Sequence, residues 1–284
     1  MAMTSADKAS SNQSIAASDE LFAGSIPAIY DRYLVPLIFE GYADDLAARV
    51  LRIKPERVLE TAVGTGVLTR ALAFRLSASV HIVATDLNQP MLDYAQQQLP
   101  GDGRIRWQQA NALALPFADQ TFDVVACQFG AMFFPDKIQG YREARRVLKL
   151  KGQFLFNVWD HISANDFAEI VTQALAMTFP QDPPLFLART PHGYHDTARI
   201  KAELAVAGFS SIAVDTYEKV SKAPSARDVA IAYCQGTPLR HEIEARDRSR
   251  LPQVTQAAAD LLAQRFGSGP IEGRIKAHLL SAIR

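Results

Sequence analysis

The chain has 284 residues and equal numbers of acidic and basic side chains, so its formal net charge is zero. Proteins that neutralise many phosphates are usually basic, and this balance disfavours a nucleic-acid partner. No apolar run approaches the roughly 20 residues of a membrane-spanning helix, so no membrane association is expected. The two cysteines show no metal-ligand spacing, which favours a reduced, cytoplasmic setting without a bound metal.

The first 54 residues divide into two parts. Residues 1–20 are rich in Ala, Ser and Asp, which predicts a disordered lead-in. Residues 21–54 predict helices that cover a site, because apolar residues recur in them at helical spacing. Tyr30 and Tyr33 are candidate substrate contacts in this segment, although packing in a core is the more common role for such rings.

The stretch 57–86 predicts half of a nucleotide-binding βαβ unit. An apolar strand leads into a glycine-rich turn, a helical pattern follows, and a second apolar strand ends at Asp86. Gly64 and Gly66 would let a ligand approach the backbone closely, and the start of the helix offers unpaired N–H groups to it. Asp86 lies about 20 residues after the turn, where a carboxylate can accept hydrogen bonds from ribose hydroxyls.

The turn matches neither of two common nucleotide-binding patterns. A dinucleotide fingerprint that starts at Gly64 requires a small residue where the chain has Thr69. No Gly-Lys-Ser/Thr sequence follows, so a Walker-type loop is absent. A nicotinamide-dependent oxidoreductase is therefore a weaker interpretation of this segment.

The sequence E-T-A-V-G-T-G at 60–66 resembles the first motif of the class I S-adenosylmethionine-dependent methyltransferases, roughly E/D-x-G-x-G-x-G. Ala62 replaces the first glycine of that motif, and alanine is small enough for a tight turn if its φ stays negative. The sequence Q-A-N-A at 109–112 resembles a second family block, in which an acidic residue and its neighbour hold the adenine. Asn111 could accept a hydrogen bond from adenine, or it could be a turn residue bound to its own backbone.

The resemblance covers roughly residues 55–160 and is to small-molecule, methyltransferase type 11-like members of the family. It implies an α/β, Rossmann-like fold with a seven-stranded, mostly parallel sheet, helices on both faces and an antiparallel last strand. It also implies S-adenosyl-L-methionine as cofactor and in-line transfer of its methyl group to a small-molecule acceptor. The cofactor contacts that it implies are Glu60, Ala62, Gly64, Gly66, Asp86, Leu87, Met91, Asn111, Ala112, Gln128 and Phe129.

Beyond about residue 160 the chain leaves the family pattern. Helical patterns between the last two expected strands predict an insertion, a candidate lid over the acceptor, whose charged stretch 241–250 should face solvent. The expected boundaries are 55–219 and 271–284 for the methyltransferase domain, about 163–190 for a first insertion, and 220–270 for the lid.

The catalytic base stays open at the level of sequence. His192, Tyr194 and His195 are candidates by residue type, but a structural role for loop histidines is more common. Phe133 and Tyr233 are further candidate substrate contacts. Fold resemblance also leaves two alternatives to methyl transfer: a relative that binds the cofactor while catalysing another step, and a non-catalytic binding module. The sequence does not specify the oligomeric state.

Overall fold

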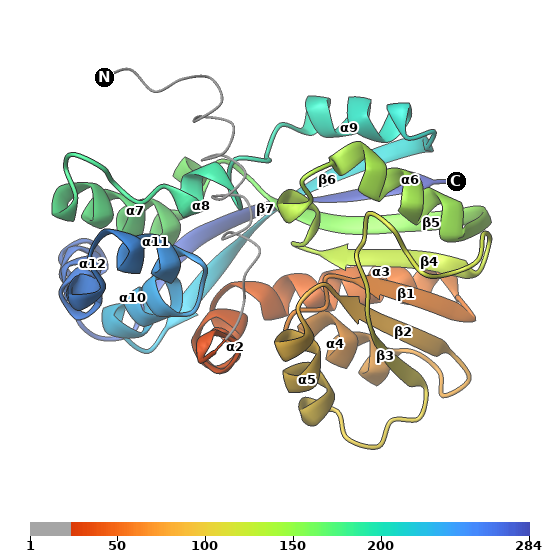
Figure 1. Ribbon diagram of the computed structural model, residues 1–284, viewed down its shortest axis with the longest axis horizontal. Helices are drawn as coiled ribbons and strands as arrows, with labels where there is room; N and C mark the ends of the chain where they lie inside the picture. The colour runs from red at the N-terminus through yellow and green to blue at the C-terminus, as the bar shows by residue number, and fades with distance from the viewer. Residues whose placement is uncertain (1–23) are drawn as a thin grey trace.

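A seven-stranded sheet in the order β3-β2-β1-β4-β5-β7-β6 runs through the centre of the computed structural model, which describes residues 24–284 (Figure 1). The expected disorder at 1–20 lies outside the described residues. Strands β1 to β5 pair in parallel, whereas β7 is antiparallel to both of its neighbours. This topology confirms the predicted fold class. The strands are β1 (Arg57–Thr61), β2 (His81–Asp86), β3 (Ile105–Gln109), β4 (Phe122–Gln128), β5 (Leu148–Trp159), β6 (Ser210–Ala223) and β7 (Ile271–Ile283).

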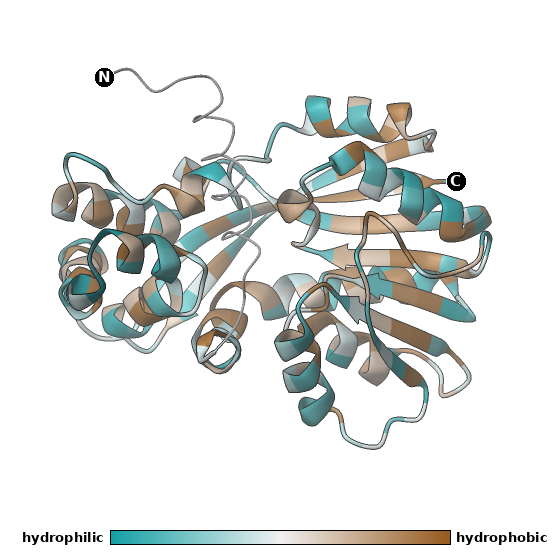
Figure 2. Ribbon diagram, viewed as in Figure 1, coloured by the Kyte–Doolittle hydropathy of each residue, from teal (hydrophilic) through white to brown (hydrophobic). Residues whose placement is uncertain are grey.

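Helices cover both faces of the sheet because each presents an apolar side to it. One core joins α3, α4 and α5 to the strands, and the other joins α6 and α9 to the opposite face. The central strands carry mostly apolar residues, as expected for strands that are covered on both faces (Figure 2). These helices are α3 (Glu40–Ile53), α4 (Val67–Arg75), α5 (Gln89–Gln98), α6 (Lys137–Val147) and α9 (Thr197–Val206).

A second group of helices lies beyond the carboxyl ends of the parallel strands, at the left of Figure 1. Helices α7, α10, α11 and α12 pack on one another, and the long strands β6 and β7 extend to this group. The N-terminal helices α2 and η1 also contact α10, so segments far apart in the sequence meet here. The elements are α2 (Ile26–Ile29), the π-helix η1 (Tyr30–Phe39), α7 (Asp166–Thr178), α8 (Phe186–Arg189), α10 (Ala226–Gln235), α11 (Leu239–Asp247) and α12 (Leu251–Phe266), with short 3-10 turns η2 (Ala131–Phe133), η3 (Ile162–Ala164) and η4 (Arg248–Arg250).

The expectation for 241–250 is only partly correct. Its charged residues belong largely to α11, whose Leu239 and Ile243 are fully buried one helical turn apart. Glu242 of the same helix pairs with Arg189 at 2.7 Å and accepts the N–H of Leu185. The charges therefore cover an amphipathic helix and hold the α8 segment against it.

Candidate cofactor and acceptor site

A cavity opens at the carboxyl ends of β1, β2 and β4, the edge at which open α/β sheets bind ligands. Residues from η1 and from the loop after β3 complete its wall. The structure thus brings most of the predicted cofactor contacts together around one space. Those that line it are Ala62, Gly64, Asp86, Leu87, Met91, Asn111, Ala112, Gln128 and Phe129.

Glu60 and Gly66 do not line this cavity. Glu60 is 1% exposed and accepts a hydrogen bond from Thr69 Oγ1 at 2.7 Å. Burial raises the pKa of Glu60 to about 8, so its carboxyl keeps a proton at neutral pH. A β-carbon at Gly66 would lie 3.1 Å from the β-carbon of Ala95, which indicates that close packing of α4 on α5 requires this glycine.

Asp86 ends β2 with a buried carboxylate that organises the loop. Oδ2 accepts the N–H of Gly64 and Oδ1 accepts the N–H of Asn88, each at 2.8 Å. Burial raises the pKa of Asp86 on balance, although these N–H donors oppose the shift. Each carboxylate oxygen has a second lone pair, so both can still accept a hydrogen bond from a ligand hydroxyl.

The backbone of the loop is left-handed at two positions that face the cavity. Gly64 has φ of +58°, and a β-carbon on it would meet no described atom within 4 Å, so the space above it is open to a ligand. Ala62 has φ of +55°, so the condition of a negative φ under which alanine fits a tight turn is not met. The chain must reverse here so that the N–H of Val63 can reach the carbonyl of Thr85, a geometry that glycine adopts without steric cost.

Asn111 and Gln128 line the cavity while each makes a structural hydrogen bond. Oδ1 of Asn111 accepts the N–H of Leu113 at 2.9 Å, which is the turn role, and an adenine amino group would have to share this oxygen. Nε2 of Gln128 donates to the carbonyl of Phe39 at 3.0 Å and fixes the end of η1 on the sheet.

A second cavity adjoins the first and is mostly apolar. The two cavities share Tyr30, Phe39, Phe129 and Phe133 as a common wall. Phe129 has φ of +52° and stacks on Trp159, with ring centroids 3.7 Å apart and planes 10° apart. Strain of this kind persists where the surrounding packing holds it, and here it places an aromatic ring between the two cavities.

The other candidates from the sequence fall into two groups. Tyr233 and His192 line the second cavity, whereas Tyr33, Tyr194 and His195 line neither. The hydroxyl of Tyr194 donates a hydrogen bond to the carboxylate of Glu203 and is also hydrogen-bonded to the hydroxyl of Tyr141. Burial raises the pKa of Tyr194.

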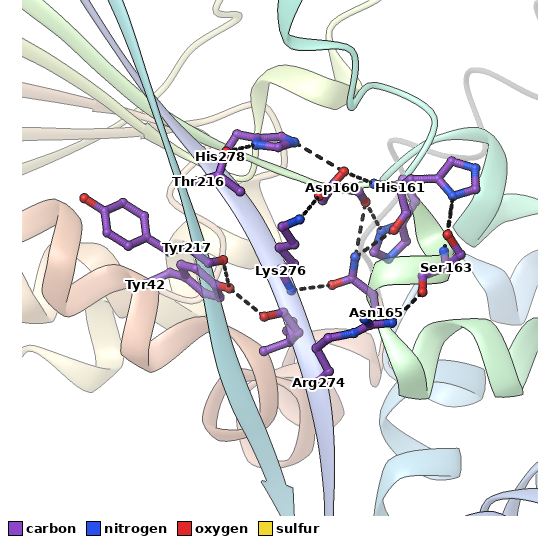
Figure 3. A network of polar contacts seen from close by, with 12 residues as sticks. Tyr42, Asp160, His161, Ser163, Asn165, Thr216, Tyr217, Arg274, Lys276 and His278 are labelled. Carbon is purple, nitrogen blue, oxygen red and sulfur yellow. Dashed lines mark hydrogen bonds and ion pairs between the residues drawn. The ribbon is translucent and has the colours of Figure 1, made fainter.

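His192 belongs to a network around Asp160, part of which is shown in Figure 3. The carboxylate of Asp160 lies 3.2 Å from Nζ of Lys276 and 3.4 Å from Nε2 of His278. Burial acts to raise the pKa of Asp160, but the His161 N–H and the nearby His278 and Lys276 side chains lower it on balance. The network ties the end of β5 to β7 beside the second cavity.

Sequence reasoning missed several wall residues. Trp159 had a usable signal, because it ends a predicted strand at the carboxyl edge of the sheet. Thr65 lies inside the first motif, and its buried Oγ1 has no hydrogen-bond partner among residues 24–284. No sequence signal marked Phe39, Phe186 and Leu187 as wall residues, since only the tertiary fold brings them to the cavities.

Comparison with known proteins decides the family. A sequence profile described as a methyltransferase domain matches residues 59–156. Demethylmenaquinone methyltransferase of Deinococcus radiodurans is 36% identical over 152 residues, which cover 52% of this chain and 61% of that protein. The ubiquinone/menaquinone biosynthesis C-methyltransferase UbiE of Stenotrophomonas maltophilia is 33% identical over 171 residues, which cover 56% of this chain and 68% of the relative. The chain belongs to the class I S-adenosylmethionine-dependent methyltransferases.

Membership confirms the resemblance and names the cofactor of the family, S-adenosyl-L-methionine. A class I methyltransferase structure with this cofactor bound, phosphoethanolamine N-methyltransferase 2 of Haemonchus contortus, shares the fold with a TM-score of 0.52. Its identity is 18%, over 84% of this chain and 52% of that one, so the likeness concerns the fold alone. The chain spans only about three fifths of the Deinococcus relative, and the profile ends before the segments that complete the second cavity.

The first cavity of this chain suits the cofactor of the family. The Asp86 carboxylate offers two oxygens to ribose hydroxyls, and the open space above Gly64 is where a β-carbon would intrude on a ligand. Among residues 24–284, no three His, Cys, Asp or Glu side chains gather into a metal site. No helix in that range is long and apolar enough to cross a bilayer.

Proposed function

We propose that this protein transfers the methyl group of S-adenosyl-L-methionine to a small, largely apolar acceptor held in the second cavity. The observation that carries the proposal is the common wall of Tyr30, Phe39, Phe129 and Phe133. A cavity with a buried carboxylate lies on one side of this wall, and an aromatic cavity lies on the other. Ligands in these two adjoining cavities would lie next to each other, and the orientation of two reactants can supply several kcal/mol of a barrier.

In this proposal the carboxylate of Asp86 accepts hydrogen bonds from the ribose hydroxyls, and the segment at Asn111 and Ala112 borders the adenine. The loop at Ala62 and Gly64, together with Gln128 and Phe129, borders the methionine part. When bound, the cofactor supplies a methyl group on a positively charged sulfur. The protein side chains need to orient the acceptor and exclude water, and the apolar wall supports both roles.

The names of the two quinone-related methyltransferases support an aromatic acceptor. A planar ring could stack against the wall formed by Phe129 and Trp159, where offset aromatic stacking adds to apolar burial. Helix α10 contributes Tyr233 to the same cavity, and the turn before α11 contributes Pro238. We therefore also propose residues 220–270 as its lid and residues 21–54 as a cover over both cavities.

The test is incubation of the purified protein with isotopically methyl-labelled S-adenosyl-L-methionine and a panel of naphthols, hydroquinones, amines and thiols, followed by mass spectrometry. The proposal predicts label in at least one aromatic member and much less label with Asp86→Asn protein at the same sub-saturating cofactor concentration. Tight cofactor binding without a methylated product from any member would contradict it. That outcome would favour a relative that catalyses another step or a binding module.

A further inference from the structure

Polar side-chain groups interrupt the apolar wall of the second cavity at Tyr30, His192, Tyr233 and Thr237. His192 and Tyr233 line it and are each only 5% exposed. Nδ1 of His192 lies 2.9 Å from the carbonyl oxygen of Asp160. A carbonyl can only accept, so Nδ1 carries a proton and donates it.

The remaining ring nitrogen of His192 is consequently an acceptor. Burial lowers the pKa of His192 to about 4, so the ring is neutral near pH 7. With Nδ1 protonated, the neutral imidazole has its lone pair on Nε2. The hydrogen bond to the Asp160 carbonyl occupies Nδ1, and Nε2 lies on the other side of the ring.

Neither Nε2 of His192 nor the Tyr233 hydroxyl has a hydrogen-bond partner among residues 24–284. Both keep contact with open space, because neither is among the fully enclosed polar atoms that lack a partner. Thr237, which also lines the cavity, is satisfied: its hydroxyl donates to the carbonyl of Tyr233 at 2.7 Å and accepts the N–H of Leu239 at 3.2 Å. His192 and Tyr233 thus present one acceptor and one hydroxyl to a ligand in this cavity.

We infer that His192 and Tyr233 together hold a single hydroxyl group of an otherwise apolar, planar acceptor and so determine which acceptors bind. The inference rests on the proposed function. Nε2 can only accept, so the ligand group must donate, which selects a hydroxyl over an ether or a ketone. The Tyr233 hydroxyl donates to the oxygen of the same group. A ligand without the donor leaves a buried nitrogen unpaired, and sites of this kind reject such analogues strongly.

The test compares the binding of 1-naphthol and 1-methoxynaphthalene, which share their rings but differ in the hydrogen-bond donor. Dissociation constants are measured by calorimetry on the full chain in saturating S-adenosylhomocysteine. The wild type should prefer 1-naphthol on the order of 10-fold to 100-fold. Equal affinity for the two probes, or no binding of 1-naphthol, would overturn the inference.

Variants separate the two ring nitrogens. His192→Asn retains a donor for the Asp160 carbonyl but has no atom at the position of Nε2, so the preference should fall to within roughly 3-fold. Tyr233→Phe removes only the hydroxyl and should reduce the preference as well. His195→Asn is the matched control, because it makes the same change in the same loop at a ring that lines neither cavity, and its preference should stay at the wild-type value.

Retention of the full preference in both His192→Asn and Tyr233→Phe would overturn the inference. If His192→Asn does not fold, as judged by its thermal unfolding, Tyr233→Phe alone decides. The affinity for S-adenosylhomocysteine, measured in the same samples, separates the two proposals. Its absence in the wild type counts against the proposed function, whereas its persistence alongside an unselective second cavity counts only against the role of His192 and Tyr233.

Discussion

Replacing Glu60 with glutamine should remove a large part of the pH dependence of folding stability. The carboxyl lies under the cofactor loop and is 1% exposed, and among residues 24–284 its hydrogen-bond partner is the hydroxyl of Thr69. Burial raises its pKa from 4.5 to about 8 in the folded protein. Between these two values the folded protein keeps the proton and the unfolded chain releases it.

The sign and size of the effect follow from proton linkage. The stability from the protonated carboxyl is fully present below about pH 4.5 and is lost as pH rises towards about 8. For one proton the free energy of unfolding falls by about 1.4 kcal/mol per pH unit, which gives roughly 5 kcal/mol across the whole window.

Urea unfolding of wild type and Glu60→Gln between pH 5 and pH 8, at constant ionic strength, measures this slope. Glutamine keeps an oxygen for Thr69 but cannot ionise, so the variant should gain stability relative to wild type by about 1.4 kcal/mol per pH unit. Glu40→Gln, at an exposed helical position, is the matched control and should run parallel to wild type. A difference between Glu60→Gln and wild type that does not change with pH would refute the reasoning, because Glu60 would then be ionised in the fold.

Three further substitutions test separate parts of the structure. Ala62→Gly relieves a left-handed alanine and should raise the free energy of unfolding by about 0.5–1 kcal/mol in urea melts, and a loss of stability would contradict the strain. Asp123→Ala removes the acceptor of two backbone N–H groups at the far end of the sheet and should cost about 1–3 kcal/mol of stability, with calorimetry showing unchanged cofactor affinity. Tyr194→Phe should lower thermal stability through the lost bond to Glu203 without changing the rate of methyl transfer, and a slower rate at unchanged stability would make Tyr194 part of the reaction.

The sequence was sufficient for the parts of the fold that depend on local pattern. The apolar strand, glycine turn and following helix at 57–76 have a strong periodic signal, and Asp86 falls at the end of β2 as its spacing predicts. Asp196 and Ser225 are residue types that favour helix N-caps, and in the structure they precede α9 and α10 with side chains that accept at least one backbone N–H of the first turn.

Features that depend on tertiary packing could not be read in this way. The left-handed φ of Ala62 results from the path of the loop towards Thr85, and nothing in the motif itself shows it. The second cavity joins Phe39, Trp159 and Tyr233, which lie on three elements separated by long stretches of chain. The role of His192 depends on its distance from the Asp160 carbonyl, so residue type alone could not separate it from His195.

Calorimetric titration with S-adenosylhomocysteine of wild type and Asp86→Asn tests the central claim most directly. If the buried carboxylate at the end of β2 holds the ribose of the cofactor, the wild type should bind and the variant should lose about 1–3 kcal/mol of binding free energy, with both proteins shown to be folded by thermal unfolding. Equal affinity in the two proteins, or no binding by the wild type, would contradict the assignment of this cavity to the cofactor.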